Sequence, residues 1–141
     1  MHVVLNSLYN TLTNLMETNT KTFKYVDYLW DQKKADALGD DQVALFLYRS
    51  NILGADLRIT NYGGGNTSCK TIEKDPLTNK DVEVMWVKGS GGDIGTLNRA
   101  GIAGLYTSRL RDLKNVYQGL HDEDRMVGLF NHCIYDLDSK A

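Results

Sequence analysis

Residues 56–93 read DLRITNYGGGNTSCKTIEKDPLTNKDVEVMWVKGSGGD and decide how this chain folds. Apolar and polar residues alternate over three parts of the stretch, and alternation with a period of two is typical of β-strands. We therefore predict strands at 57–59, 67–71 and 82–87. The third strand carries apolar residues at both alternating sets of positions, and we expect it to be buried on both faces.

Glycine, proline and asparagine separate these strands. The run GGGN at 63–66 predicts a turn between the first and second strands. The run DPLTN at 75–79 predicts a hairpin, because proline fixes φ and asparagine tolerates the left-handed conformation. A second glycine-rich loop, GSGG at 89–92, ends the third strand. The sequence thus predicts a sheet built from hairpins.

Helical periodicity appears on both sides of this segment. We expect a short helix that contains the apolar residues at 25–30 and ends near Gly39, followed by a longer one over 40–53. Asp40 or Asp41 can cap the second helix, and Gly54 suits its C-terminus.

Two more helices are expected after the second glycine loop, at 102–117 and from the acidic run 122–124 to Ile134. Asp122, Glu123 and Asp124 are interpreted as a solvated helix start. Helices around a hairpin-connected sheet favour a layered mixed α/β domain.

The composition excludes several classes of protein. The chain has 141 residues, 42% of them apolar, which suits one globular domain. Its net charge of -2 comes from interspersed charges without a basic block, so nucleic acid is not an expected partner. Cys69 and Cys133 form no metal or disulfide pattern, and residues 1–16 resemble neither a secretory signal nor a membrane span. We expect a cytoplasmic protein.

The two glycine loops are the strongest candidates for a binding site. Consecutive glycines followed by Asn66 expose backbone amides that suit an anion, and Ser90 with Gly91 repeats this in the second loop. Glycines between strands also serve as ordinary turns that need a positive φ, and this alternative stays open. Neither a Walker A element nor a GxGxxG dinucleotide fingerprint occurs.

Other polar residues give weaker signals. His2, His121 and His132 have no metal-ligand spacing. Asp93 either lies beside a ligand at the second loop or caps the segment after it. Cys69 is interpreted as a small hydrophobe of a strand.

Arginines at 99 and 109 are candidates for pairing with a substrate anion. Surface arginines usually have no such specific role, so Arg99 and Arg109 remain weak candidates.

Three long runs resemble one known family. They are ALGDDQVALFLYRSNILGADLRITNYGGGNTSCKT (37–71), DPLTNKDVEVMWVKGSGGDIGTLNRAGIAGLY (75–106) and EDRMVGLFNHC (123–133). The chain from 22 to 141 is similar to the N-terminal part of the class II aldolase/adducin domain, as found in the bifunctional rhamnulose-1-phosphate aldolase/short-chain dehydrogenase proteins. Residues 1–21 form a leader outside the resemblance.

The resemblance implies a three-layer α/β/α fold with a largely antiparallel central sheet, incomplete here at its C-terminus. It also implies that Gly65, Asn66, Ser90 and Gly91 bind the substrate phosphate. The expected substrate is a phosphorylated ketose, and homo-oligomers are expected for the complete protein.

The implied reaction is zinc-dependent retro-aldol cleavage of rhamnulose 1-phosphate to dihydroxyacetone phosphate and lactaldehyde, in which zinc acts as a Lewis acid. The family's HxH pair, later histidine and preceding acid have no match among these 141 residues. We therefore assign no catalytic residue and no metal ligand to this chain, and expect the isolated chain to be inactive. NAD would belong to the dehydrogenase domain, which also has no counterpart here.

Two alternatives share the fold. One is a pentulose-phosphate epimerase of the same superfamily, which resembles the aldolases in its phosphate loops. The other is a non-catalytic, adducin-like assembly module.

Overall fold

The computed structural model describes residues 24–137. Short helices, three strands and single 3-10 turns alternate along the chain. In order they are α2 (Gln32–Ala37), α3 (Gln42–Ala55), β1 (Ser68–Lys74), β2 (Asp81–Lys88), η1 (Ile94–Thr96), η2 (Arg99–Gly101), β3 (Ile102–Tyr106), α4 (Thr107–Val116), η3 (Leu120–Asp122), α5 (Glu123–Leu129) and η4 (Phe130–Cys133). The leader at residues 1–21 lies outside the described residues.

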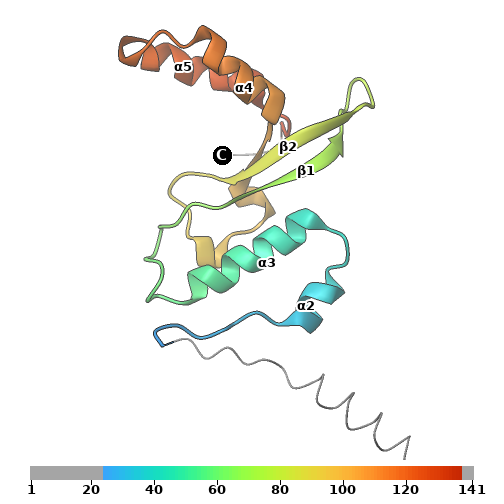
Figure 1. The fold of residues 1–141 in the computed structure, drawn as a ribbon, viewed down its shortest axis with the longest axis vertical. Coiled ribbons are helices and arrows are strands. Elements are labelled where there is room, and N and C mark those ends of the chain that lie inside the picture. Colours follow the sequence, from blue (N-terminus) through green and yellow to red (C-terminus); the bar gives the residue numbers. More distant parts are fainter. Residues whose placement is uncertain (1–23, 138–141) are drawn as a thin grey trace, which may run out of the picture.

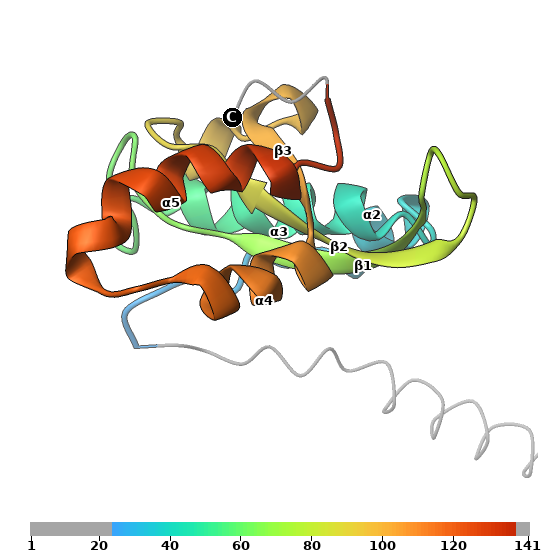
Figure 2. The same ribbon diagram turned by 90° about the horizontal axis from the view of Figure 1, so that it is seen from above.

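An antiparallel sheet with the strand order β1-β2-β3 forms the centre of the fold (Figure 1). β1 and β2 pair from Ser68↔Val87 to Lys74↔Asp81. An isolated bridge between Leu105 and Ile134 lies at β3. Helices α2 and α3 lie on one side of the sheet, and α4 and α5 on the other (Figures 1 and 2). The predicted mixed α/β fold with an antiparallel sheet is confirmed.

The hydrophobic core lies between α3 and one face of the sheet. Val84 and Trp86 of β2 point to this face, where they pack with Val43 and Phe46 of α3. The Phe46 side chain is 2% exposed, and its burial contributes about 2 kcal/mol. A Cβ on Gly104 of β3 would lie 2.8 Å from the Trp86 ring, so glycine alone lets the strand pass beneath it.

The opposite face of the sheet is less covered than expected. Met85 and Val87 are only half-buried, so the prediction that this strand is buried on both faces is wrong. The reason is that α4 covers this face only partly. It contacts β2 through a surface ion pair between Arg111 and Glu83, at 3.1 Å.

The segment 102–117 is not one helix, because Ile102–Tyr106 forms β3 and α4 begins only at Thr107. Ile102 and Tyr106 fit a period of four and a period of two equally well. The exposed edge of β2 decides between them, since pairing there satisfies the backbone groups of both strands.

One other prediction is wrong and one is right only in part, for a shared reason. The segment 57–59 forms no strand. The short helix expected to end near Gly39 forms as α2, but it begins at Gln32 and does not contain residues 25–30. In both places an aspartate organises the backbone instead: Asp56 holds a turn, and Asp31 accepts hydrogen bonds from Lys33 and Lys34 at the start of α2. Local side-chain acceptors of this kind override a weak apolar pattern.

Other helix boundaries agree more closely with the sequence. Asp41 caps α3 through the amides of Val43 and Ala44. Gly54 lies within the last turn of α3, one residue before its end. The predicted hairpin forms, and Asn79 has a φ of +55°. The last helix is shorter than expected, because α5 ends at Leu129 and a 3-10 turn follows it.

An open apolar groove of about 520 Å³ lies between α4 and α5. Leu110 and Leu113 line it from α4, and Met126 and Val127 from α5. Within residues 24–137, no helix has the length and apolar character needed to cross a bilayer.

Candidate functional site

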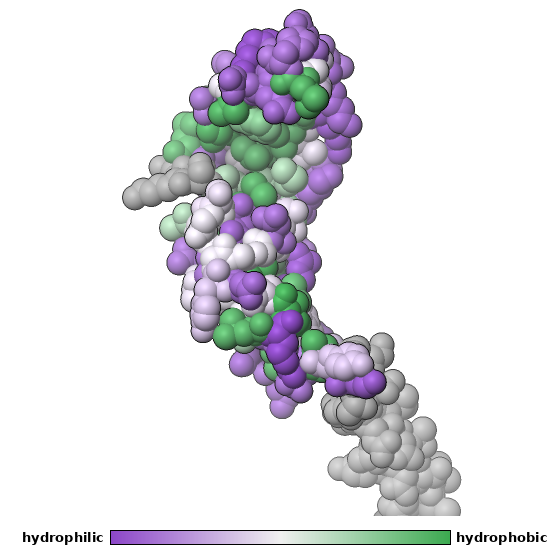
Figure 3. All heavy atoms as spheres, turned by 90° about the vertical axis from the view of Figure 1, so that its left-hand side faces the viewer, coloured by the Kyte–Doolittle hydropathy of each residue, from purple (hydrophilic) through white to green (hydrophobic). Residues whose placement is uncertain are grey.

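The two glycine loops lie side by side at one end of the sheet, because β1 begins after the first and β2 ends at the second. The Lys88 amide donates to the Thr67 carbonyl at 3.1 Å, which extends the pairing to the loops themselves. A Cβ on Gly63 would lie 3.9 Å from the Gly91 carbonyl oxygen. Figure 3 faces this end of the sheet, where a pale, weakly polar surface separates two apolar areas.

The first loop, residues 61–67, contains glycines at positions where the backbone has a positive φ. Gly63 and Gly65 have φ values of +70° and +83°. A Cβ on Gly65 would lie 3.1 Å from the Ile94 side chain, so this glycine also allows close packing. The need for positive φ is therefore real, and the glycines alone do not identify a ligand site.

The second loop, residues 89–93, is more open. Gly91 has a φ of +78°, and a Cβ added there would meet no atom within 4 Å. A pocket of about 340 Å³ lies between this loop and residues 96–101, with Ser90 and Gly92 in its wall. Neither Gly65 nor Asn66 lines that pocket, so the open space lies on the side of the second loop.

Asp93 is the cap of the segment after the loop. Its carboxylate accepts a hydrogen bond from the Gly95 amide at 2.9 Å, at the start of η1. Of the two interpretations of this residue, capping is the one that the geometry supports.

Lys88 is the residue that the sequence analysis missed. Its side chain is buried, at 9% exposure for the residue, and its Nζ donates to the Gly89 carbonyl at 2.9 Å. Its Cε would lie 3.9 Å from a Cβ on Gly92, so the side chain folds back beneath the second loop. Within residues 24–137 it forms no ion pair with a carboxylate.

A lysine is almost never fully buried without a partner charge, because desolvation of the ammonium is unfavourable. The sequence carries a signal for this position. Lys88 is the cation that directly follows the apolar strand residues and directly precedes the glycine loop.

Helix α3 holds both loops in place. Asn51 donates to the carbonyls of Ile94 and Leu97, at 3.1 and 3.0 Å, which fixes the segment after the second loop. The Ser50 hydroxyl lies 3.0 Å from that of Thr67, which fixes the end of the first loop. Two consecutive residues of α3 therefore hold the first loop and the segment after the second.

The closest contact of α3 is between glycines. A Cβ on Gly54 would lie 2.1 Å from the Gly95 nitrogen, so the helix backbone packs directly on η1. Only glycine allows this approach.

The other candidate cations have partners within the domain. The Arg99 guanidinium lies 4.6 Å from the Trp86 ring centre, and that of Arg109 lies 4.1 Å from the Tyr106 ring centre. Cation–π contacts of this kind stabilise the fold, and neither arginine is needed as an anion ligand to explain its position.

The acidic run at 122–124 is not simply a solvated helix start. Asp122 is 9% exposed, and both of its carboxylate oxygens accept hydrogen bonds from Arg125 at 2.6 Å. These bonds lower the pKa of Asp122. Asp122 and Arg125 therefore form a structural ion pair.

Cys69 and the histidines show no sign of a catalytic or metal site. Cys69 packs against the core, and burial raises the pKa of its thiol, which disfavours a nucleophilic role. No group of three histidine, cysteine, aspartate or glutamate side chains between residues 24 and 137 is arranged to hold a metal. His2 lies outside the described residues.

The fold resembles a known structure. Over 69% of its length, the chain superposes on 44% of the N-terminal class II aldolase domain of a conserved protein from Thermoplasma acidophilum, with a TM-score of 0.58 and 27% identity. The chain has the fold of a class II aldolase domain.

This class II aldolase-like chain is also similar in sequence to a curated bacterial protein. It is 40% identical over 111 residues to the uncharacterized oxidoreductase YuxG of Bacillus subtilis. That alignment covers 79% of the chain and 16% of the relative. The chain thus spans less than half of the structural neighbour and about a sixth of the curated relative. No protein-family model matches it.

Proposed function

We propose that this class II aldolase-like chain binds the phosphate group of a phosphorylated ketose between its two glycine loops. The observation that carries the proposal is Lys88, a buried lysine without a carboxylate partner among the described residues, directly beneath the second loop. A bound phosphate would supply the missing negative charge. The ion pair would form in a partly desolvated place, where charges attract more strongly than in water.

Each of the four predicted residues has a suitable group for this task. Gly65 and Gly91 let the main chain approach an anion without obstruction by a Cβ. Asn66 and Ser90 carry an amide and a hydroxyl, both of which can donate a hydrogen bond to phosphate oxygen. A site of neutral donors around one cation suits a phosphate monoester.

The proposed reaction of the complete protein is the cleavage of rhamnulose 1-phosphate to dihydroxyacetone phosphate and lactaldehyde. The class II aldolase fold supports the aldolase part of this assignment. The choice of sugar rests on the resemblance of the three long runs of sequence. The phosphate site would orient the sugar, since tight binding of a non-reacting group holds the substrate in the geometry that the reaction needs.

The residues at hand do not fit the zinc ion that this reaction uses in the family. The described chain offers no cluster of ligands for it, and no catalytic step is assigned to residues 24–137. The contribution proposed for this chain is therefore substrate binding.

A titration with inorganic phosphate tests the proposal. Isothermal calorimetry on the 141-residue chain at neutral pH should detect one site of millimolar or better affinity. Asn66→Gly removes a predicted donor from the first loop and should weaken binding by about tenfold or more, the value of one hydrogen bond to a charged group.

Asn79→Gly is the matched control, because Asn79 lies in the hairpin turn with a φ of +55° that glycine adopts readily. It should leave phosphate affinity unchanged. Absence of phosphate binding by the unsubstituted, folded chain would contradict the proposed function, and so would equal losses in the two variants.

A further inference from the structure

The turn that leads from α3 into the first glycine loop is held by a single carboxylate. The chain leaves α3 at Ala55, and Asp56 is its C-terminal cap. The Asp56 side chain is only 6% exposed. One of its oxygens accepts hydrogen bonds from the amide and the Nε of Arg58, at 3.0 and 2.8 Å. The other oxygen accepts from the Arg58 guanidinium at 2.7 Å.

The Asp56 main chain adds to the same turn. Its carbonyl accepts hydrogen bonds from the amides of Ile59 and Thr60, at 2.9 and 3.2 Å. Residues 56–60 therefore form one hydrogen-bonded unit with Asp56 at its centre. The bonds from Arg58 lower the pKa of the Asp56 carboxyl, so the unit keeps its charge at neutral pH.

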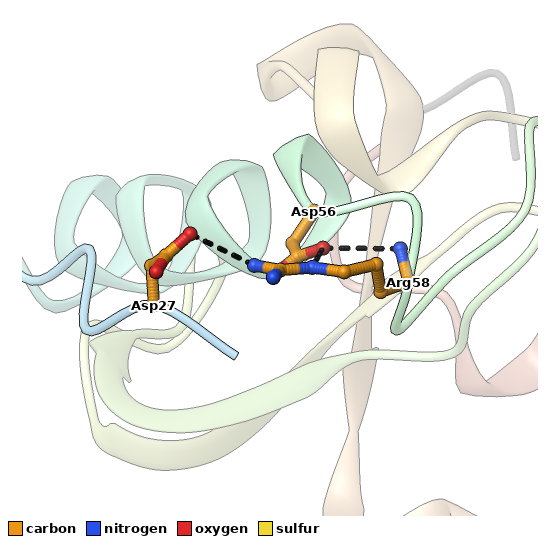
Figure 4. Close-up of polar contacts among 3 residues, drawn as sticks. All are labelled: Asp27, Asp56 and Arg58. Carbon is orange, nitrogen blue, oxygen red and sulfur yellow. Dashed lines mark hydrogen bonds and ion pairs between the residues drawn. The ribbon is translucent and has the colours of Figure 1, made fainter. Parts of the chain in front are cut away.

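Arg58 also reaches outward to a distant segment. Its guanidinium donates to Asp27 at 2.9 Å, across 31 positions in sequence, as Figure 4 shows. This outer pair is solvent-exposed, with 54% of the Arg58 side chain and 76% of the Asp27 side chain accessible. Exposed pairs of this kind contribute little, so the inner bond to Asp56 is the stronger constraint.

The loop beyond the turn has little internal support. Between residues 61 and 66 of the described chain, the backbone hydrogen bond is that from Gly64 to Asn61, at 3.0 Å. The far end is fixed by Thr67, which bonds to Lys88 and lies beside Ser50. The two ends of the loop, together with the packing of Gly65 against Ile94, decide where Asn66 lies, and the Asp56 turn is the near end.

We infer that Asp56, acting through Arg58, is a positioning residue for the first phosphate loop. It touches no substrate. It fixes the turn 56–60, so that the Gly65–Asn66 backbone is already in its binding conformation before the anion arrives. This inference rests on the proposed phosphate site. A preorganised loop loses less conformational entropy on binding, and its loosening should appear as weaker affinity.

The test compares two aspartates that each organise a turn, Asp56 between α3 and the first glycine loop and Asp75 between β1 and β2. Asp75 is 8% exposed and organises the β1–β2 turn by accepting hydrogen bonds from the amides of Leu77 and Thr78. Asp56→Asn and Asp75→Asn therefore remove the same charge from equivalent turns. Phosphate affinity is measured by calorimetry for both, at a temperature at which circular dichroism shows that each chain is folded.

Asp56→Asn should weaken phosphate binding by about fivefold, whereas Asp75→Asn should leave it within about twofold of the parent. Arg58→Ala should reproduce the effect of Asp56→Asn, and Asp27→Asn should not. If Asp56→Asn does not fold, Asp56→Glu takes its place beside Arg58→Ala, because it keeps the charge but moves the carboxylate out of position for Arg58.

The outcomes separate this role from the site itself. If the parent binds phosphate and Asn66→Gly weakens it, but Asp56→Asn and Arg58→Ala do not, the positioning role is wrong and the site stands. Weakening by Arg58→Ala without weakening by Asp56→Asn would make Arg58 a direct ligand, and would also overturn the inference. A folded parent that binds no phosphate would remove the site and this role together.

Discussion

The two ends of the β1–β2 hairpin each contain a buried charged side chain, but they differ in the number of partners that the fold supplies to it. At the turn end, Asp75 is satisfied within the fold by Leu77, Thr78 and the Tyr106 hydroxyl, the last at 2.7 Å. At the other end, Lys88 has one carbonyl as its partner and no carboxylate among the described residues. Hydrogen bonds within the fold satisfy the buried charge at the first end, whereas at the second end we propose that a bound phosphate supplies the opposite charge. The comparison is therefore between a residue expected to act in stability and one expected to act in binding.

The largest effect on stability is expected from the contact between Gly54 and Gly95, close to the glycine-loop end of the hairpin. In Gly54→Ala the new Cβ would lie 2.1 Å from the Gly95 nitrogen, and main-chain atoms cannot move aside. We predict a loss of about 3 kcal/mol in the free energy of unfolding, measured by urea denaturation. Gly128→Ala is the control, because a Cβ there meets nothing within 4 Å and should not destabilise the chain. Equal losses in both variants would contradict the account of this contact.

A smaller effect is expected at the turn end. Tyr106→Phe leaves the nearly buried Asp75 without its 2.7 Å hydroxyl donor. We predict a loss of about 1–2 kcal/mol by urea denaturation. Tyr62→Phe is the matched control, since Tyr62 is 79% exposed, and it should change stability little. An unchanged Tyr106→Phe variant would show that the turn end is not held by this bond.

The same bond predicts a dependence on acid. The Tyr106 hydroxyl and the turn amides lower the pKa of Asp75 from 3.8 to about 2. A lowered pKa in the folded state stabilises the fold above the unfolded value, and this stabilisation is lost as pH falls from about 4 to about 2.

The stability gap between the parent and Tyr106→Phe should therefore narrow over that range of pH. Urea denaturation of both chains at several pH values measures it. A gap that stays constant from neutral pH to pH 2 would argue against an ionised, hydrogen-bonded Asp75.

The smallest effect on stability is expected at Lys88. This prediction contrasts Lys88 directly with Asp75 at the other end of the hairpin. Replacing a buried charge that lacks a carboxylate partner by an apolar side chain of similar length removes a desolvation penalty. In Lys88→Met we predict an unchanged free energy of unfolding, or a gain of up to about 1 kcal/mol, by urea denaturation. A loss larger than that of Tyr106→Phe would mean that Lys88 is a structural residue like Asp75.

The sequence predicted the elements in which one signal dominates. Asp41 before the apolar period of α3, and DPLTN before the strand β2, are strong local signals, and both elements form where expected. The sequence failed at two segments for different reasons. Residues Ile102–Tyr106 form a strand because β2 offers a distant edge for pairing. The segment 57–59 forms a turn because the neighbouring Asp56 carboxylate overrides its strand-like pattern.

The candidate site was predicted in outline only. Glycine runs flanking the paired strands placed the two loops correctly, since antiparallel pairing of β1 and β2 brings their ends together. Lys88 was missed because burial of a charge is a property of the folded chain, and its place between the apolar strand and the glycine loop is only a weak signal of that burial. Gly54 and Gly95 lie 41 positions apart, so their contact also appears only in three dimensions.

The most direct test of the account is the phosphate affinity of Lys88→Met beside that of Lys74→Met, each measured by calorimetry on the folded chain. Lys74 lies at the turn end of the hairpin and pairs with Asp81 at 2.6 Å, so its replacement removes the same charge from the other end. We predict that Lys88→Met weakens phosphate binding at least tenfold, as expected for a buried charge contact, while Lys74→Met changes it less than about twofold. Equal affinities in the two variants would contradict the claim that the glycine-loop end of the sheet is built to bind an anion.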